Sequence, residues 1–361
     1  MINLKNVTLV IPTYKRYPHL LRLLKFIFTY KTKIKILILD ATPDEQINDE
    51  LIKLITKSQV RWEKYDEEIT YWDRVADGSN LIDTDYAVIC ADDDFVVPKA
   101  ISQCASFLEE NSKYSSANGL YFAHSNLETY SKYNFAISRL YQGKNSAEED
   151  TALERINAYF SGQVSSPRLY SVYRLETFKL IWSETIKYVS DWGVAEIFPC
   201  ALSYILGKSK SLPIFYSSRE LNASAWFDDS LYKKWFSKEN IEKCIVGLSG
   251  HLSRVDNFNN QESRNFLNKN FSIYLKNYEN KIELLRDNSS NSLVTKIRHK
   301  INFRHRKNVL FYKGCDPSIY PNHLNDFLKI KNAVISSKLS ADELNKSREA
   351  SLSQVLKKAS E

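Results

Sequence analysis

The stretch "YAVICADDDFVVP", residues 86–98, places three adjacent aspartates directly after a run of apolar residues. A short apolar run with β-branched members is typical of a buried strand. Three neighbouring carboxylates repel one another, so Asp92, Asp93 and Asp94 either lie in a solvated turn or helix cap, or face a cation that offsets the repulsion. The segments around the strand decide between these two interpretations.

The segments before and after the triplet alternate between strand and helix patterns. Strand patterns cover 7–11, 33–40, 59–65 and 86–91, and helix patterns cover 19–30, 41–57, 70–82 and 99–111. This alternation predicts a parallel sheet with helices on both faces and right-handed crossovers. Ligands of such sheets gather outside the carboxyl ends of the strands. Because Asp40 ends the second strand, we expect it to open onto the same side as the triplet.

The rest of the chain continues as α/β and then becomes helical. Strand patterns follow at 119–125, 168–174 and 212–220, with a helix pattern at 194–207. From about Asp228 the pattern is helical, polar and aromatic. We therefore predict an α/β domain over 1–227, with halves 1–119 and 120–227, and a helical C-terminal region over 228–361.

The composition is that of a folded globular protein. Of 361 residues, 43% are hydrophobic and 13% aromatic. The longest apolar runs are strand-sized, far short of the ~20 residues that a membrane helix needs, and the start of the chain has no signal-peptide pattern. Five widely spaced cysteines without a C-x-x-C pair fit a reducing compartment. These features predict a cytoplasmic protein.

The net charge of +7 is unevenly placed. Six of the basic residues lie in "TKIRHKINFRHRK", residues 295–307. Ile297, Ile301 and Phe303 among them predict a cationic amphipathic helix over 296–307 that contacts an anionic membrane surface; a solvated helix face is the alternative. A single short cluster without a recognisable motif predicts no nucleic-acid partner. The polar helix pattern after about residue 333 either frays or pairs with another subunit in a homo-oligomer.

A hard divalent cation accounts for the clustered aspartates. Mg²⁺ or Mn²⁺ completes an octahedral shell with one or two aspartate oxygens and the phosphates of a substrate. An EF-hand is excluded, because the stretch lacks the glycine and the final glutamate of that loop. The chemistry implied is group transfer from a nucleotide diphosphate or triphosphate, with the metal stabilising charge on the leaving oxygen.

The order of three segments then carries a resemblance to a known family. "VTLVIPTYKR" (7–16), "ILILDATPDE" (36–45) and the segment from the strand at 86 to Gly119 resemble the nucleotide-binding half of GT-A-fold glycosyltransferases, close to family 2. The resemblance covers 6–119 well and 168–219 more loosely, and leaves the C-terminal third unmatched. It implies a GT-A-type, Rossmann-like mixed sheet flanked by helices, with a mainly helical C-terminal extension.

The resemblance also implies roles for individual residues. The nucleotide-sugar contacts it implies are Pro12, Thr13, Tyr14, Arg16, Asp40, Arg74, Asp92, Asp93, Trp192 and Arg219. Asp40 would accept a hydrogen bond from the base. Asp92 and Asp94 would form the D-x-D pair that binds metal, although any two of the three aspartates fit.

Three of these implied contacts have alternatives. Arg74 would lie near the diphosphate or form a surface ion pair. Trp192 would form an apolar wall for a sugar ring or serve in packing. Arg219, at the end of a predicted strand, stands where the family has a third metal ligand or a phosphate contact.

Inverting transfer also needs a carboxylate that takes the proton of the incoming hydroxyl. The stretch 190–213 resembles the family's acidic segment, in which an acid opens a helix that ends at a glycine, here Gly207. Glu196 is the first candidate for the base and Asp191 the second. The alternatives are a helix-start carboxylate for Glu196 and the N-cap for Asp191.

The sequence thus predicts a metal-dependent, inverting glycosyltransferase. It would move a sugar from a nucleotide-sugar donor to a glycan or lipid-linked acceptor in surface polysaccharide synthesis, in the cytoplasm or at the inner face of the membrane. A nucleotidyltransferase acting on a sugar phosphate is one alternative, but it needs a glycine-rich phosphate loop that "PTYKRYPH" lacks. A non-catalytic subunit that binds nucleotide sugars or glycans is the other.

Overall fold

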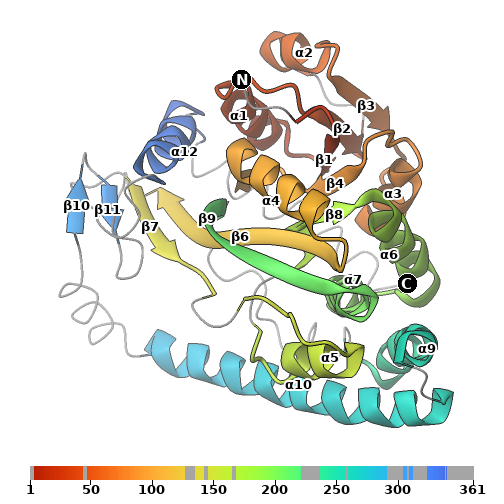
Figure 1. Ribbon diagram of the computed structural model, residues 1–361. Coiled ribbons are helices and arrows are strands. Elements are labelled where there is room, and N and C mark those ends of the chain that lie inside the picture. The colour runs from red at the N-terminus through yellow and green to blue at the C-terminus, as the bar shows by residue number, and fades with distance from the viewer. Residues whose placement is uncertain are drawn as a thin grey trace.

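A mixed sheet lies at the centre of the computed structural model (Figure 1). The residues that the structure describes are 4–43, 47–126, 135–141, 145–164, 168–220, 236–256, 259–290, 304–306, 309–311, 323–337 and 339. The strands are β1 (Val7–Thr13), β2 (Lys35–Asp40), β3 (Val60–Lys64), β4 (Tyr86–Ile89), β5 (Phe95–Val96), β6 (Tyr114–Asn126), β7 (Phe135–Arg139), β8 (Val172–Arg174), β9 (Lys208–Glu220), β10 (Arg304–Arg306) and β11 (Val309–Phe311). The helices are α1 (Tyr17–Phe28), α2 (Asp49–Ile55), α3 (Tyr71–Ser79), α4 (Pro98–Glu110), α5 (Ala152–Phe160), α6 (Leu175–Tyr188), α7 (Trp192–Leu206), α9 (Lys238–Asp256), α10 (Asn260–Ser290) and α12 (Leu324–Ser337), with a 3-10 turn at Arg168–Tyr170.

Side-chain caps set the start of several of these helices. Asn48 accepts a hydrogen bond from the amide of Leu51 at the start of α2, and Thr70 does the same for Asp73 at α3. Thr151 forms a full capping box at the start of α5. Each cap satisfies amide groups that have no partner within the helix, so these short polar residues fix where the helices begin.

The strand order confirms the predicted fold class. The sheet runs β10-β11-β7-β6-β8-β4-β1-β2-β3, and β9 pairs with both β5 and β6. Strands β4, β1, β2 and β3 are mutually parallel, whereas β8 is antiparallel to β4, so the sheet is mixed. Thr13 lies opposite Asp40, and the register Val10 to Ile89 brings the residues after β4 beside the end of β1. The parallel strands therefore end at one common edge, as predicted.

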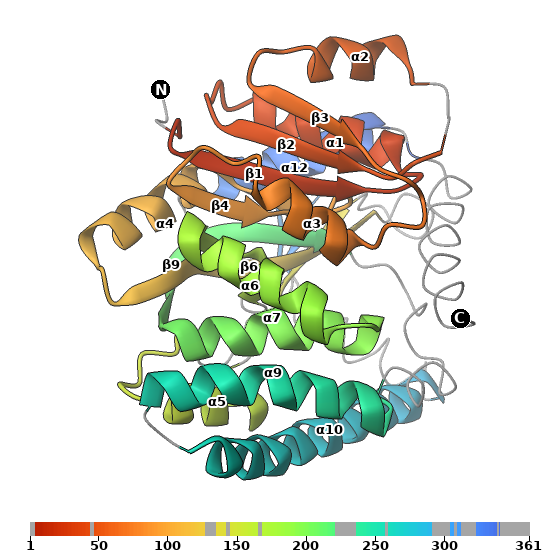
Figure 2. The same ribbon diagram turned by 90° about the vertical axis from the view of Figure 1, so that its right-hand side faces the viewer.

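Alternating residues of β1 face two separate cores. Leu9 and Ile11 are buried with α1, α4 and α12, while Val10 is buried with α3, α6 and α7. Figure 2 shows α3 and α6 in front of the parallel strands and α1 behind them. A strand buried on both faces has to be apolar throughout, which explains the unbroken run at 7–11.

The C-terminal third adds both helices and strands to this arrangement. Helices α9 and α10 pack beside α5 and α7 (Figure 1), and Phe327 of α12 contacts Phe122 and Phe215 of the sheet. Strands β10 and β11 extend the sheet through β7, so the described C-terminal part is not purely helical. The predicted boundary at 227/228 falls within 221–235, outside the described residues, and stays a prediction.

Two local predictions differ from the structure. The predicted strand at 168–174 begins as a 3-10 turn and becomes strand β8 only at Val172. Of the predicted amphipathic helix over 296–307, residues 296–303 and 307 lie outside the described residues, and 304–306 form strand β10 rather than helix.

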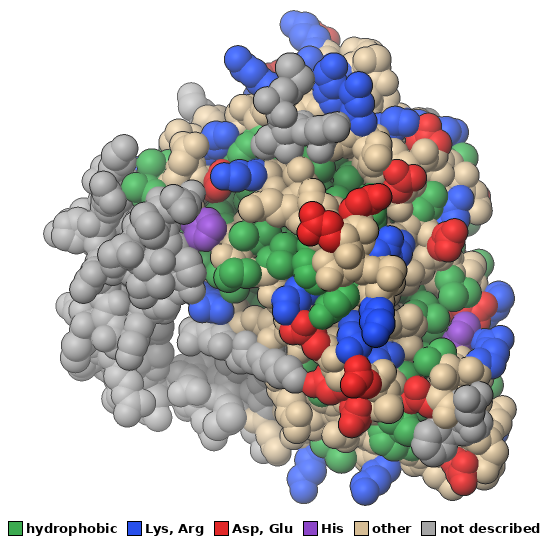
Figure 3. Space-filling model, viewed as in Figure 1, with side chains coloured by type: hydrophobic (Ala, Val, Ile, Leu, Met, Phe, Trp, Pro, Cys, Tyr) green, Lys and Arg blue, Asp and Glu red, His purple; other side chains and the backbone are tan. Residues whose placement is uncertain are grey.

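No helix in the described part of the chain is long and apolar enough to cross a membrane. Figure 3 shows acidic and basic side chains interspersed on the face it presents. Among the described residues, this face therefore carries no large patch of a single charge sign.

Gly119 marks a close approach of β6 to β9 that yields a stability prediction. A Cβ at this position would lie 2.6 Å from the carbonyl oxygen of Ile214 and 3.0 Å from the Cβ of Tyr216. Backbone cannot move aside cheaply, so we expect Gly119→Ala to lower the free energy of unfolding by about 1–3 kcal/mol. Urea unfolding monitored by circular dichroism measures this change in the free energy of unfolding.

Gly250, inside α9, is the matched control, because a Cβ there meets no atom within 4 Å. Gly250→Ala should leave stability unchanged or raise it by up to about 1 kcal/mol through helix propensity. Equal effects of the two substitutions would contradict the close contact at Gly119.

Candidate active site

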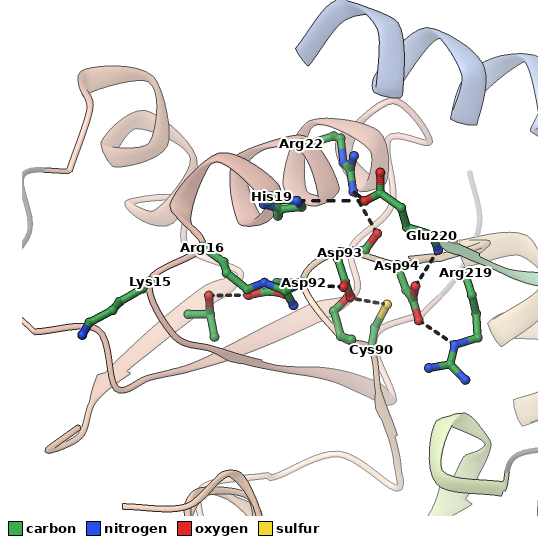
Figure 4. Close-up of polar contacts among 12 residues, drawn as sticks. Lys15, Arg16, His19, Arg22, Cys90, Asp92, Asp93, Asp94, Arg219 and Glu220 are labelled. Carbon is green, nitrogen blue, oxygen red and sulfur yellow. Dashed lines mark hydrogen bonds and ion pairs between the residues drawn. The ribbon is translucent and has the colours of Figure 1, made fainter. Parts of the chain in front are cut away.

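The loop after β1 binds the acid triplet, Asp92 to Asp94, from one side. The Thr13 hydroxyl donates to Oδ2 of Asp92 at 2.7 Å. The Arg16 guanidinium donates to Oδ1 of Asp92 at 3.0 Å and to Oδ2 of Asp93 at 2.9 Å. Figure 4 shows Arg16 reaching across to both aspartates. One guanidinium thus bridges two neighbouring carboxylates, a geometry that suits the planar fork of arginine.

The end of β9 holds the triplet from the other side. Strand β5 directly follows the triplet and pairs with β9, which places Ser218 opposite Phe95. Nε of Arg219 then donates to Oδ2 of Asp94 at 3.1 Å, and the amide of Glu220 donates to Oδ1 of Asp94 at 2.9 Å. Both oxygens of Asp94 are therefore bound by β9.

A third arginine, Arg22 of α1, joins the two sides. It donates to the backbone carbonyl of Asp93 and to Oε2 of Glu220, each at 2.8 Å. Its side chain is only 1% exposed, whereas those of Arg16 and Arg219 are 14% and 31% exposed. Arg22 therefore connects the triplet to β9 inside the protein, while the side chains of Arg16 and Arg219 are partly exposed.

Burial and the arginines set the ionisation of this cluster. Burial raises the pKa of Asp92 to about 6 and of Asp94 to about 7, against the opposing effect of Arg16 and Arg219. At Asp93 the positive charges, Arg16 foremost, outweigh burial and lower the pKa to about 2. The loop is thus a place where unpaired negative charge is costly, which explains why three arginines converge on it.

The donor set does not suit the predicted divalent cation as it is arranged. Both oxygens of Asp92 and both of Asp94 accept hydrogen bonds, and Asp93 binds Arg16. No three His, Cys, Asp or Glu side chains of the described residues converge on a point where they could hold a metal ion. Mg²⁺ or Mn²⁺ on Asp92 and Asp94 stays a prediction from the resemblance.

Asp40 and Arg74 lie deeper than predicted. Asp40 is fully buried, and its carboxylate accepts from the Tyr17 hydroxyl at 2.8 Å, the Lys64 ammonium at 3.1 Å and the Thr42 amide at 2.8 Å. It orders the loop after β2 and has no surface for direct contact with a base.

Arg74 is buried and forms no surface ion pair, and its predicted place near the diphosphate stays a prediction. It is 2% exposed and donates to the carbonyls of Thr13 and Leu39, at the ends of β1 and β2. Its role in this structure is to tie α3 to the sheet edge. Burial lowers its pKa to about 10, because the charged form is desolvated.

The remaining residues of the first loop reach the surface of the same edge. The Lys15 amide donates to the Thr42 hydroxyl at 2.8 Å, and the Tyr14 hydroxyl donates to Glu67 at 3.2 Å. Pro12 and Tyr14 are half-buried. These contacts connect the loops after β1, β2 and β3 into one rim, where the predicted nucleotide contacts of Pro12 and Tyr14 can lie.

Glu196 lies on α7 with its side chain exposed. Its charge acts on Arg219 and Tyr170, and also on Tyr71, Tyr159 and Tyr278. Arg219 in turn lies over the Tyr170 ring at 5.2 Å and binds Asp94. The charge of Glu196 thus reaches the arginine that binds the triplet, and its role as the base stays a prediction.

Asp191 and Trp192 adopt their alternative, structural roles. Asp191 is the N-cap of α7 and accepts from the Gly193 amide at 2.9 Å. Trp192 packs against Tyr71 and Trp72, with ring centroids 5.1 and 5.4 Å apart. Trp192 thus belongs to an aromatic cluster, and a stacking role towards a sugar stays a prediction for its half-buried face.

Sequence reasoning missed the inner layer of the site. Arg22, His19 and His124 are buried next to the triplet, and the side chain of Glu220 is 5% exposed. Glu220 carried a signal as the neighbour of Arg219 at the end of a predicted strand, and His124 follows a predicted strand but is more simply interpreted as a packed or capping histidine. Burial lowers the pKa of both histidines to about 4, so they are neutral at physiological pH.

Comparisons with known proteins add the following. No protein-family model and no curated protein matches the sequence. Among solved structures, the chain is similar to residues 1–349 of S. aureus TarS, with a TM-score of 0.49 and 11% identity over 98% of this chain and 90% of that one. It is likewise similar to that protein in complex with UDP-GlcNAc (TM-score 0.48) and with UDP (TM-score 0.46), at the same identity and coverage. Such values do not transfer a function, so the fold class rests on the strand order and pairing described above.

The buried histidines make stability depend on pH. In the unfolded chain a histidine has a pKa of about 6.5, so between about pH 6.5 and 4 the unfolded state binds more protons than the folded state. The free energy of unfolding should then fall as the pH falls. His124→Gln removes one of these groups while keeping a partner for Ser218, and should make the fall smaller by about 1–3 kcal/mol.

Urea unfolding of both proteins from pH 4.5 to 7.5 tests this. Asp92 and Asp94, whose pKa values are raised, act with the opposite sign in this range. The difference between variant and wild type, rather than the wild-type slope, is therefore the quantity to compare. Parallel curves would show that His124 is not held neutral by burial.

Proposed function

We propose that this protein transfers a glycosyl group from a nucleotide sugar to an acceptor hydroxyl. The observation that carries the proposal is an exposed carboxylate, Glu196, whose charge acts on Arg219, the residue that binds Asp94 at the carboxyl edge of a parallel sheet. Open α/β sheets bind their ligands at this edge, and a base at its rim can act on a second substrate. The glycosyltransferase resemblance of 6–119 gives this arrangement a reaction.

The donor would bind along the rim formed by the loops after β1, β2 and β3. Arg16 and Arg219 present partly exposed guanidiniums on either side of the triplet. Guanidinium groups bind phosphate oxygens with two parallel hydrogen bonds. The diphosphate would therefore lie over the triplet, with the nucleoside towards Pro12 and Tyr14 and the sugar towards Tyr170 and Glu196.

The reaction follows from these positions. Glu196 takes the proton of the acceptor hydroxyl, whose oxygen attacks the anomeric carbon on the face opposite the diphosphate. The bond between that carbon and the diphosphate oxygen breaks, and the negative charge on the leaving group is stabilised by the guanidiniums. A single displacement of this kind inverts the anomeric configuration.

A glycan or lipid-linked glycan is the acceptor class we propose, in surface polysaccharide synthesis at the inner face of a membrane. The exposed position of Glu196 supports a bulky acceptor, because such an acceptor needs a base that it can reach from the surface. The membrane contact over 296–307, of which only β10 at 304–306 is described, and the homo-oligomer remain proposals.

Glu196→Gln provides the test of the base. The variant should release nucleoside diphosphate at least about 100-fold more slowly than the wild type, since general-base catalysis contributes on this order, while binding of UDP is unchanged. Glu176, an exposed acid in the first turn of α6, is the matched control, and Glu176→Gln should retain wild-type turnover. UDP and UDP-GlcNAc are the first probes.

The alternatives predict other outcomes. A nucleotidyltransferase would release pyrophosphate from a nucleoside triphosphate and a sugar phosphate. A binding subunit would bind UDP or a nucleotide sugar without turnover in any variant. Full turnover in Glu196→Gln together with loss in Asp191→Asn would move the base to Asp191.

A further inference from the structure

We propose that Arg16 and Arg219 neutralise the acid triplet in place of a divalent metal ion. The diphosphate of the donor then binds to these two arginines, beside the triplet. The first half of this inference, that the triplet does not hold a divalent ion, stands on the contacts of the chain alone. The second half, that the arginines contact a diphosphate, rests on the proposed function.

The carboxylate oxygens that a metal would need are already bound. Asp92 is held by Thr13 and Arg16, and Asp94 by Arg219 and the Glu220 amide. A hard cation such as Mg²⁺ binds carboxylate oxygens at about 2.0–2.1 Å, so at these oxygens it would compete with the guanidinium of Arg16 or Arg219. Its positive charge would lie within a few ångströms of a guanidinium of the same sign, and this repulsion opposes binding.

The charge of the cluster is already nearly balanced. Its carboxylates come from Asp92, Asp93, Asp94 and Glu220, and its guanidiniums from Arg16, Arg22 and Arg219. The histidines beside it are buried and neutral, so the cluster carries a net charge of about −1. Three bare aspartates would attract a dication strongly, whereas a cluster with matched arginines does not.

The three arginines differ in exposure and in partners, and this difference supports a phosphate-binding role for Arg16 and Arg219. Arg22 is enclosed and binds a backbone carbonyl and Glu220. Arg16 and Arg219 are partly exposed, on loops and strand ends that face the rim. Each can keep one hydrogen bond to its aspartate while it donates another to a phosphate oxygen, since a guanidinium has five donors.

Titration with Mn²⁺, followed by electron paramagnetic resonance of the free ion, tests the first half without any nucleotide. The wild type should bind Mn²⁺ no more tightly than Asp94→Asn does. Arg16→Gln should bind it about tenfold or more tightly, and adding Asp94→Asn to Arg16→Gln should abolish that gain.

Two further variants keep this test interpretable. Arg16→Lys keeps the charge and should gain no Mn²⁺ site, and it replaces Arg16→Gln as the informative variant if the latter fails to fold. Arg264→Gln removes an exposed arginine that pairs with Glu242 on the helical surface, and should change nothing. Tight Mn²⁺ binding by the wild type that Asp94→Asn removes would overturn the inference.

Calorimetry with UDP tests the second half. UDP affinity should differ less than about twofold between EDTA and Mn²⁺, and Arg16→Gln should weaken it about tenfold or more in both conditions. Binding that appears only with Mn²⁺ overturns the inference and leaves the proposed function intact. Absence of UDP binding in both conditions contradicts the phosphate role and the proposed donor, while the Mn²⁺ titration still decides the first half.

Discussion

The paired contacts between three aspartates and three arginines are the constraint on which the site depends. A loop with Asp92, Asp93 and Asp94 at the end of a buried strand is stable only if its negative charge is met close by. Arg16 directly precedes α1, Arg22 lies in the middle of that helix, and Arg219 comes from the end of β9. The charge of one loop thus joins segments more than a hundred residues apart.

The pairing of β5 with β9 makes this arrangement rigid. The two-residue strand β5 follows the triplet at once, and its bonds to Ser217 and Ser218 place Arg219 and Glu220 within reach of Asp94. Strand β9 follows α7, the helix that carries Glu196, after a single residue. Donor rim, triplet and candidate base are therefore held by one continuous sheet and the helices on its two faces, which is what catalysis by positioning requires.

Sequence reasoning found the elements whose signals are local. The unbroken apolar runs predicted β1, β2 and β4, the helical periodicities predicted α1, α3 and α4, and the position of the triplet at a strand end was correct. Short strands such as β5 and β10 were not predicted, because their pairing with β9 and β11 depends on distant segments. Helices α5 and α6 were also missed, since no helix was predicted over 152–160 or 175–188.

The site residues show the same limit. Asp40 and Arg74 have a residue type and a sequence position that suit ligand contact, but both side chains are buried. Burial depends on the whole fold and so could not be predicted from the local sequence. Glu196 and Asp191 are five residues apart, yet the helix start at Trp192 makes one an exposed acid and the other a cap. The pairing of Arg16 and Arg219 with the triplet could not be predicted, since no local pattern links residues this far apart.

A crystal structure grown with UDP and Mn²⁺, with anomalous data collected at the manganese edge, would show whether arginines or a metal ion neutralise the triplet. We expect a diphosphate within hydrogen-bonding distance of the Arg16 and Arg219 guanidiniums and no anomalous peak at the triplet. A manganese peak on Asp94, with Arg219 turned away from it, would show that a metal ion and not Arg219 balances the charge of Asp94.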